Sequence, residues 1–213
     1  MVPANFRPVS LTSHVMKVFE RVIKVQLVGH LVKNDLLKKN QHGFVAGRST
    51  QTQLLQHYTD VFEAMLEGAR LDTIYLDFAK AFDKVDHDIL LRKIAGRGIK
   101  GKLGMWIKDF LNDRRYRVLA NGMMSEEQEV VSGVPQGTVL ASIFFVIMIS
   151  DIDENLKNSV VRLFADDTRV SAKIRTKEDM ELLQQDLDAV YGWAEKNLME
   201  VYGLEKMLLL KII

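Results

Sequence analysis

The order of hydrophobic and polar residues predicts a mixture of helices and strands. Apolar residues three or four positions apart indicate one face of a helix, whereas apolar residues at every second position indicate a half-buried strand. The continuous apolar run at 139–149 follows a Gly-Val-Pro-Gln-Gly turn and is typical of a buried helix. We expect helices over residues 13–33, 54–65, 88–97, 102–112, 139–149 and 177–197, and strands over residues 73–78, 116–120, 128–131, 160–164 and 169–174.

Some of these elements have a predicted orientation. The apolar side chains of the helix around 54–65 are expected to face inward, namely Leu54, Leu55, Tyr58, Val61, Phe62 and Met65. In the strand at 73–78, one side carries Ile74, Leu76 and Phe78, and the other carries Thr73, Tyr75 and Asp77. Ala165-Asp166-Asp167-Thr168 connects the last two strands, which places two carboxylates at the tip of a hairpin.

The elements do not follow the repeated strand–helix–strand order of a parallel sheet. Helices and hairpins are mixed, and no internal repeat or low-complexity linker separates them. This pattern indicates an α+β fold. A length of 213 residues suits one domain, or one and a half, with a substantial core.

Composition excludes several classes of protein. With 47% hydrophobic residues and a net charge of +1, disorder is not expected. The absence of cysteine excludes disulfides and thiolate metal sites. The apolar run at 139–149 is shorter than the roughly 20 residues of a membrane helix, and no leader opens the chain. We therefore expect an intracellular protein, nuclear or cytoplasmic, with no membrane partner.

The near-neutral charge averages unlike segments. Residues 1–50 hold eight Lys or Arg against two acids, and 92–117 hold nine against two, whereas 151–213 hold nine against thirteen. Basic blocks beside acidic ones suit a protein that holds polyanions in one place and cations in another, although solvated helix faces show the same pattern. In the second basic block, Arg114, Arg115 and Arg117 are candidates for salt-sensitive contacts with a nucleic-acid backbone.

The candidate chemistry lies at the strand ends. Asp77 ends one strand, and Asp166 and Asp167 connect two others. Taken singly, such residues are also common caps and turn formers. Together they form an oxygen-donor set for hard cations such as Mg²⁺, and two such ions about 4 Å apart support in-line displacement at phosphorus. Phosphate loops, dinucleotide fingerprints, paired histidines and serine elbows are all absent.

Five short motifs follow one another along the chain. The first two are Asn5-Phe6-Arg7-Pro8-Val9-Ser10-Leu11, and Gln41-His42-Gly43-Phe44 followed by Gly47-Arg48-Ser49-Thr50. The others are YLDFAKAFDKVDH from Tyr75, SGVPQGTVL from Ser132, and Phe164-Ala165-Asp166-Asp167. In this order they resemble the reverse transcriptase domain of non-LTR retrotransposons of the LINE or jockey type. The resemblance implies an RNA-directed DNA polymerase with a right-hand architecture. Residues 1–70 would form partial helical fingers and 71–213 the palm, a small antiparallel sheet packed on helices, with no thumb.

The resemblance also implies roles for individual residues. Asp77, Asp166 and Asp167 would hold two Mg²⁺ or Mn²⁺ ions together with the backbone carbonyl of Phe78. Phe82 would select deoxynucleotides by crowding a 2′-hydroxyl. The incoming dNTP would be contacted by Arg48, Gln136 and Gly137. Lys206, in a segment that departs from the family pattern at Tyr202, is the candidate general acid.

The implied partners are an RNA template, a DNA primer and a dNTP, and the sequence does not indicate an oligomeric state. We expect the thumb and endonuclease regions of a full element to lie outside this chain, and processive synthesis by the chain alone to be poor. Two alternatives remain. One is a group II intron or telomerase-like reverse transcriptase, and the other is a retroelement remnant that binds nucleic acid without catalysis.

Overall fold

The structure is a computed structural model that describes residues 9–201 and 208–212. Its helices are α1 (His14–Lys33), α2 (Thr50–Leu66), α3 (His87–Gly96), α4 (Gly101–Leu111), α5 (Ala141–Ile149) and α6 (Lys177–Lys196). Its strands are β1 (Arg70–Leu76), β2 (Arg115–Tyr116), β3 (Leu119–Ala120), β4 (Met123–Met124), β5 (Gln128–Glu129), β6 (Val160–Phe164), β7 (Asp167–Ile174) and β8 (Leu208–Ile212).

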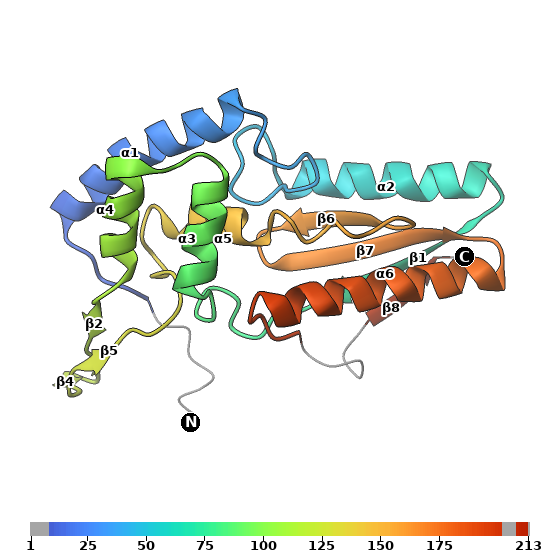
Figure 1. The fold of residues 1–213 in the computed structure, drawn as a ribbon. Coiled ribbons are helices and arrows are strands. Elements are labelled where there is room, and N and C mark those ends of the chain that lie inside the picture. The colour runs from blue at the N-terminus through green and yellow to red at the C-terminus, as the bar shows by residue number, and fades with distance from the viewer. Residues whose placement is uncertain (1–8, 202–207, 213) are drawn as a thin grey trace.

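The main sheet has four strands in the order β6-β7-β1-β8. Every neighbouring pair in it is antiparallel, and β1 pairs with β7 from Arg70 opposite Ile174 to Leu76 opposite Thr168. The remaining strands form two short ribbons, β2 with β5 and β3 with β4, at the far end of the molecule from the sheet (Figure 1). The predicted α+β fold with a small antiparallel sheet is confirmed.

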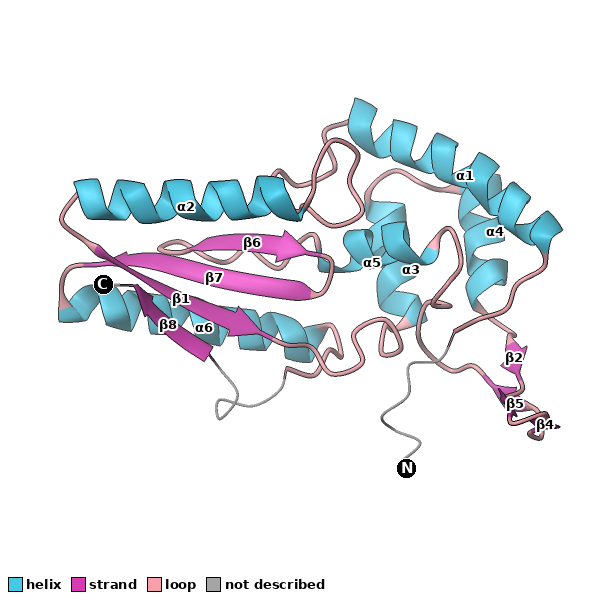
Figure 2. Cartoon of the chain, turned by 180° about the vertical axis from the view of Figure 1, so that it is seen from behind, coloured by secondary structure: helices cyan, strands magenta, loops and turns pink. Residues whose placement is uncertain are grey.

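A helix covers each face of the main sheet, α2 on one side and α6 on the other (Figure 2). The two faces differ in polarity because the side chains of each strand alternate. On the face toward α2, Leu71 packs against Ala64, and the Thr73 and Ser171 hydroxyls lie 3.1 Å apart. The opposite face carries the apolar side chains Ile74, Leu76, Val170, Ala172 and Ile174, which share one core cluster with α6 residues Leu183, Leu187 and Val190.

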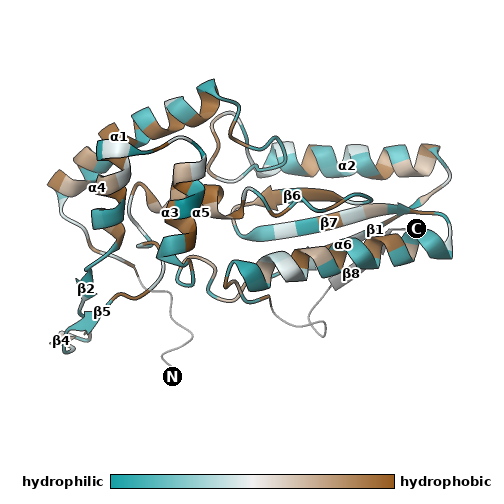
Figure 3. Ribbon diagram, in the orientation of Figure 1, coloured by the Kyte–Doolittle hydropathy of each residue, from teal (hydrophilic) through white to brown (hydrophobic). Residues whose placement is uncertain are grey.

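The other half of the molecule is helical. There α3 packs against both α4 and α5, and all nine residues of α5 except Ser142 are buried. Figure 3 shows α5 in the brown of hydrophobic residues. Phe144 and Phe145 are completely inaccessible, and α1 adds Ile23, Leu27 and Leu31 to the same cluster. One continuous core therefore joins the helical half to the sheet, which fixes the end of β1 against the residues before α5.

The predicted helix around 54–65 exists as α2, but its predicted inner face is wrong. Most of the apolar side chains expected inside are more than half exposed: Leu54, Leu55, Tyr58, Phe62 and Met65. The helix instead turns His57, Ala64 and the half-buried Val61 toward the protein. The reason is that α2 lies on the polar face of the sheet, so small and polar residues make its contacts.

The other elements match the predicted ranges to within a few residues, except in two respects. The segments 116–120 and 128–131 form only two-residue strands, and the strands β4 and β8 were not predicted. Val139 and Leu140 precede α5, which begins at Ala141. In the part of the chain that the structure describes, no helix is both long and apolar enough to cross a membrane.

Candidate active site

The three predicted metal-site carboxylates lie at one end of the main sheet. The ladder between β1 and β7 ends where Leu76 faces Thr168. Asp77 follows Leu76 directly, Asp167 precedes Thr168, and Asp166 lies in the two-residue turn between β6 and β7. Register alone therefore brings these residues together from segments far apart in the sequence. All three are partly or well exposed to solvent, as ligands of a hydrated cation must be.

Carboxylate oxygens are the donors that Mg²⁺ and Mn²⁺ prefer, so the donor set fits these ions. Among the residues that the structure describes, no three Asp, Glu or His side chains are close enough to form a ready coordination shell. The three carboxylates thus lie at the same end of the sheet, but their side chains are not close enough together to coordinate one ion. Phe78, whose carbonyl is the fourth predicted ligand, is buried, packs edge-on against Trp193 and forms a bridge with Val201.

The turn that carries Asp166 is supported from outside the sheet. Gln41 forms a parallel bridge with Leu163, and its side-chain amide contacts both backbone polar groups of Ala165. Gly43 lies so close that a Cβ on it would stand 2.3 Å from the Ala165 nitrogen. Gln41 was part of a recognised motif, but no role was predicted for it. The sequence feature that could have indicated a role is an amide side chain two positions before Gly43.

Arg48, the predicted triphosphate contact, is tied to its own loop. Its Nη1 donates to the carbonyl oxygens of Lys38 at 2.7 Å and Gln41 at 2.5 Å. These bonds use one of its nitrogens and shape the loop before α2. The guanidinium is partly exposed, so its remaining donors are not all enclosed by the protein. Its contact with a nucleotide stays a prediction.

His42 joins the same loop to α2. Its ring nitrogens lie 2.8 Å from the Thr52 hydroxyl and 2.9 Å from the Gln56 side-chain oxygen. Burial lowers the pKa of His42; the hydrogen bond with Gln56 opposes this, and the charges of Arg48, Arg162 and Arg169 lower it further. The imidazole therefore links the loop to α2 through both of its ring nitrogens.

Phe82, the predicted selector of deoxynucleotides, is held in an aromatic cluster. It stacks on Phe145 with ring centroids 4.4 Å apart and meets Phe44 edge-on at 6.3 Å. Phe145 is completely buried in α5, whereas Phe44 is exposed in the loop before α2. The ring of Phe82 is thus packed between two parts of the chain and remains partly exposed, so it presents a rigid apolar surface.

The Pro-Gln-Gly turn before α5 packs onto the segment after Asp77. Gln136 donates from Nε2 to the Asp83 carboxylate at 2.8 Å, and its carbonyl accepts from the Ser10 nitrogen at 2.8 Å. Gly137 has φ +93°, a conformation that favours glycine, and Ser10 passes within 3.4 Å of where its Cβ would stand. Asp83 therefore orients the Gln136 amide, and the role of Gln136 and Gly137 toward a nucleotide remains a prediction.

The three arginines proposed for nucleic acid differ in their surroundings. Arg114 is half-buried and donates to the carbonyls of Leu111 at 2.8 Å and Gly133 at 2.7 Å, and burial lowers its pKa. Arg115 and Arg117 are exposed beside the β2–β5 ribbon, and both pair with Glu127. The latter two offer exposed guanidinium groups whose ion pairs with Glu127 lie at the surface, whereas the Arg114 guanidinium is engaged inside the protein.

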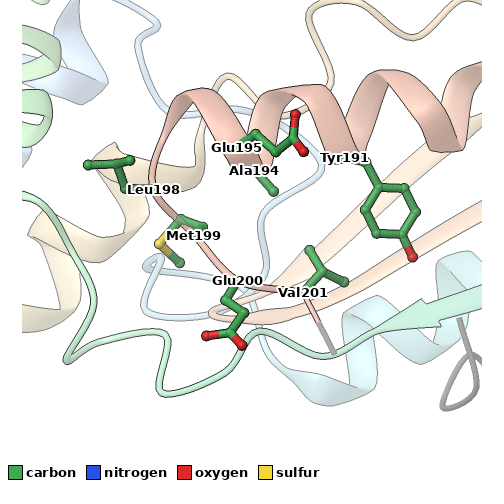
Figure 4. A pocket seen from close by; sticks show the side chains of 7 residues that line it. All are labelled: Tyr191, Ala194, Glu195, Leu198, Met199, Glu200 and Val201. Atoms are coloured by element: carbon green, nitrogen blue, oxygen red, sulfur yellow. The ribbon is translucent and has the colours of Figure 1, made fainter. Parts of the chain in front are cut away.

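A pocket lies where α6 ends (Figure 4). It is lined by Tyr191, Ala194, Glu195, Leu198, Met199, Glu200 and Val201. One of these lining residues, Glu200, is bonded to the segment after Asp77, because its carbonyl accepts from the Ala79 nitrogen at 2.8 Å. The predicted general acid Lys206, and Tyr202 near it, lie outside the described residues, as does most of the first motif.

The comparison with families of known proteins decides what this arrangement belongs to. The family described as "Reverse transcriptase (RNA-dependent DNA polymerase)" matches residues 3–207. The chain belongs to the reverse transcriptase family. The match spans the motif with Gln41, the end of β1 and the β6–β7 turn, so the predicted resemblance is confirmed over nearly the whole chain.

Relatives of this reverse transcriptase domain come from mobile elements. It is 33% identical over 181 residues to the probable RNA-directed DNA polymerase from transposon X-element of Drosophila melanogaster, covering 83% of this chain and 20% of the relative. It is 32% identical over 201 residues to the RNA-directed DNA polymerase from mobile element jockey of the same organism, covering 90% and 22%. The reverse transcriptase domain thus spans about a fifth of these relatives.

Solved structures support the fold of the reverse transcriptase domain. Apo telomerase from Candida tropicalis, truncated from its C-terminal domain, matches 92% of this chain and 40% of its own with a TM-score of 0.65 and 17% identity. Telomerase from the same organism in complex with a telomeric RNA fragment matches with a TM-score of 0.66 and 15% identity. At this identity the likeness concerns the fold, and it agrees with a polymerase palm.

Proposed function

We propose that this chain is the catalytic part of an RNA-directed DNA polymerase from a non-LTR retrotransposon. The observation that carries the proposal is the meeting of Asp77, Asp166 and Asp167 at one end of the sheet in a chain of this family. Residues 1–70 then serve as fingers and 71–213 as palm. Thumb and endonuclease belong to the remainder of a longer protein, in keeping with the fifth of its relatives that the chain spans.

The reaction joins a dNMP to a primer. The primer 3′-hydroxyl loses its proton to solvent, its oxygen bonds to the α-phosphorus of the dNTP, the bond from the α-phosphorus to the bridging oxygen of the β-phosphate breaks, and pyrophosphate leaves. Two Mg²⁺ or Mn²⁺ ions, when bound, supply activation of the attacking oxygen and stabilisation of the leaving one. Asp77, Asp166, Asp167 and the Phe78 carbonyl would hold these ions, and Lys206 would give a proton to the departing pyrophosphate.

Other side chains of this chain contact the substrates. Arg48 contacts the triphosphate, because a planar guanidinium matches phosphate oxygens. Gln136, oriented by Asp83, and Gly137 contact the nucleotide, and the packed ring of Phe82 excludes a 2′-hydroxyl. Arg115 and Arg117 contact the nucleic-acid backbone, whereas Arg114 is engaged with the carbonyls of Leu111 and Gly133. An RNA template and a DNA primer complete the proposed substrate set, and binding of a telomeric RNA fragment by a structure of like fold supports an RNA partner.

The experiment is primer extension on an RNA template with Mg²⁺ or Mn²⁺, read as addition of a single nucleotide. We expect Asp166→Asn to reduce the addition to background, because a neutral amide is a poor ligand for a hard cation. The matched control is Asp188→Asn, since Asp188 lies exposed on α6 and its carboxylate accepts from Gln184. Equal addition by the parent and Asp166→Asn contradicts the metal assignment.

The same preparation separates the catalytic proposal from a remnant that only binds nucleic acid. A remnant retains salt-sensitive binding to an RNA–DNA hybrid without adding a nucleotide under either metal. The proposed polymerase shows both activities, and only the addition responds to Asp166→Asn.

A further inference from the structure

Gln41 makes an unusually complete set of contacts for a surface-loop residue. It is 1% exposed, and its side-chain oxygen accepts from the Gly43 nitrogen at 2.7 Å and from the Ala165 nitrogen at 3.0 Å. Its side-chain nitrogen lies 3.5 Å from the Ala165 carbonyl oxygen and completes the set. One buried amide thus binds a residue of its own loop and both polar groups of the turn residue before Asp166.

The backbone on either side of Gln41 adds to this attachment. The Leu163 nitrogen donates to the Asn40 carbonyl at 2.9 Å, and the His42 nitrogen donates to the Leu163 carbonyl at 2.7 Å. Residues 40–42 therefore lie along the outer edge of β6 as a short parallel extension of the sheet. The edge of the sheet next to the turn is not open, and the loop cannot shift without disturbing β6.

Ala165 is the residue that needs such support. Its φ of +57° lies in the left-handed region, which is unfavourable for any residue with a side chain other than a few polar ones. Such a conformation persists only where the surroundings hold it in place. Here the amide of Gln41 supplies both an acceptor and a donor to the backbone of Ala165, and Asp166 is the next residue.

We propose that Gln41 is a positioning residue for the polymerase reaction: its amide fixes the Ala165–Asp166 turn and thereby sets where the Asp166 carboxylate stands. The inference rests on the proposed function for the role of Asp166. It extends that function because the loop before α2, which carries the proposed triphosphate contact Arg48, would also position the Asp166 carboxylate. Because Arg48 donates to the carbonyl of Gln41, one run of hydrogen bonds joins the proposed triphosphate contact to the turn that carries the metal ligand.

The test uses Gln41→Met and Gln41→Glu in the full chain. Methionine has a similar length and cannot accept from the Ala165 nitrogen, whereas glutamate retains the acceptor oxygen for Ala165 and Gly43. The matched control is Asn40→Ala, which removes the side-chain bond of the neighbouring residue to Asp153 at 2.9 Å and leaves the turn contacts in place.

The first readout does not depend on activity. In amide hydrogen exchange, the Ala165 amide should exchange about two- to tenfold faster in Gln41→Met, the factor that one lost hydrogen bond gives. Gln41→Glu and Asn40→Ala should keep the protection of this amide at the parent level. The proposed positioning role of Gln41 is refuted if the Ala165 amide stays protected in Gln41→Met. It is also refuted if the Leu187 amide in α6 loses protection to the same extent.

The second readout is the metal dependence of single-nucleotide addition. The Mg²⁺ concentration for half-maximal rate should rise about tenfold or more in Gln41→Met, as for other groups that orient metal ligands, and Gln41→Glu should restore most of it. A role in folding alone lowers the rate at saturating metal and leaves this concentration unchanged, which refutes the inference. If Asp166→Asn adds nucleotides normally, the proposed function is refuted instead. The hydrogen-exchange experiment then still tests whether Gln41 holds the Ala165–Asp166 turn.

Discussion

Replacing Gly43 with alanine tests the closest approach in the site. The new Cβ would stand 2.3 Å from the Ala165 nitrogen and 2.9 Å from the Phe164 carbonyl carbon, both backbone atoms. Ordinary contact begins at 3.4 Å, so the two segments must separate by about 1 Å. Gly43 itself has no left-handed conformation, so the whole cost of the substitution comes from this contact.

The magnitude follows from two contributions. Overpacking of this kind costs about 1–3 kcal/mol. The separation also weakens the bond between Ala165 and Gln41, which adds about 1 kcal/mol. We expect Gly43→Ala to lower the free energy of unfolding by about 2–4 kcal/mol, or the melting temperature by roughly 4–16 °C for a chain of this size.

The assay is urea unfolding monitored by circular dichroism, with Gly29→Ala as the control. Gly29 lies on the exposed side of α1, and nothing stands within 4 Å of its Cβ position. The same substitution there should stabilise the chain by about 0.5–1 kcal/mol, because alanine restricts the unfolded chain. A Gly43→Ala variant within about 0.5 kcal/mol of the parent would falsify the close approach.

Two further predictions concern other parts of the structure. Burial raises the pKa of Asp186, but hydrogen bonds from Lys157, Ser159 and Asn158 lower it more, so its net pKa is below the ordinary value. The stabilisation that the Asp186 carboxylate contributes is present above its unfolded pKa of about 3.9, and it is lost as the pH falls through the lower folded pKa. Asp186→Asn should therefore reduce the free energy of unfolding at pH 7 by about 1–3 kcal/mol and flatten the acid side of a plot of stability against pH. An acid side that stays unchanged contradicts this. Phe82→Val should lower discrimination against ribonucleotides about tenfold or more, measured as the ratio of dNTP to rNTP addition, and a ratio equal to that of the parent refutes the steric role.

The elements that the sequence predicted well are those whose own residues decide their surroundings. Helix α5 is apolar on all sides, so it has to be buried wherever it packs. The sequence alternates between apolar and polar residues over 73–78 and 169–174, which predicted both strands although both faces of β1 and β7 are largely buried. The site carboxylates could therefore be placed at strand ends before their register was known.

What the sequence could not predict depends on contacts between distant segments. The apolar stripe of α2 carries no information that the sheet face beneath the helix is polar, because that face is built from β1, β6 and β7. Asp60 of α2 pairs with Arg162 there at 2.8 Å, where an apolar contact was expected. Gln41 was overlooked for the same reason, since its importance comes from Ala165, more than a hundred residues later.

The strand order has a consequence for how the protein is made. Strand β1 emerges from the ribosome well before its partners, because Leu76 pairs with Thr168 and Leu71 pairs with Ile212. Pairing between such distant segments is slow, and an unpaired strand is prone to association with other chains. A nascent chain therefore carries Asp77 without Asp166 or Asp167 beside it until β6 and β7 have emerged. Translation that stops before β7 should leave the three carboxylates apart, because this end of the sheet forms only when β7 pairs with β1.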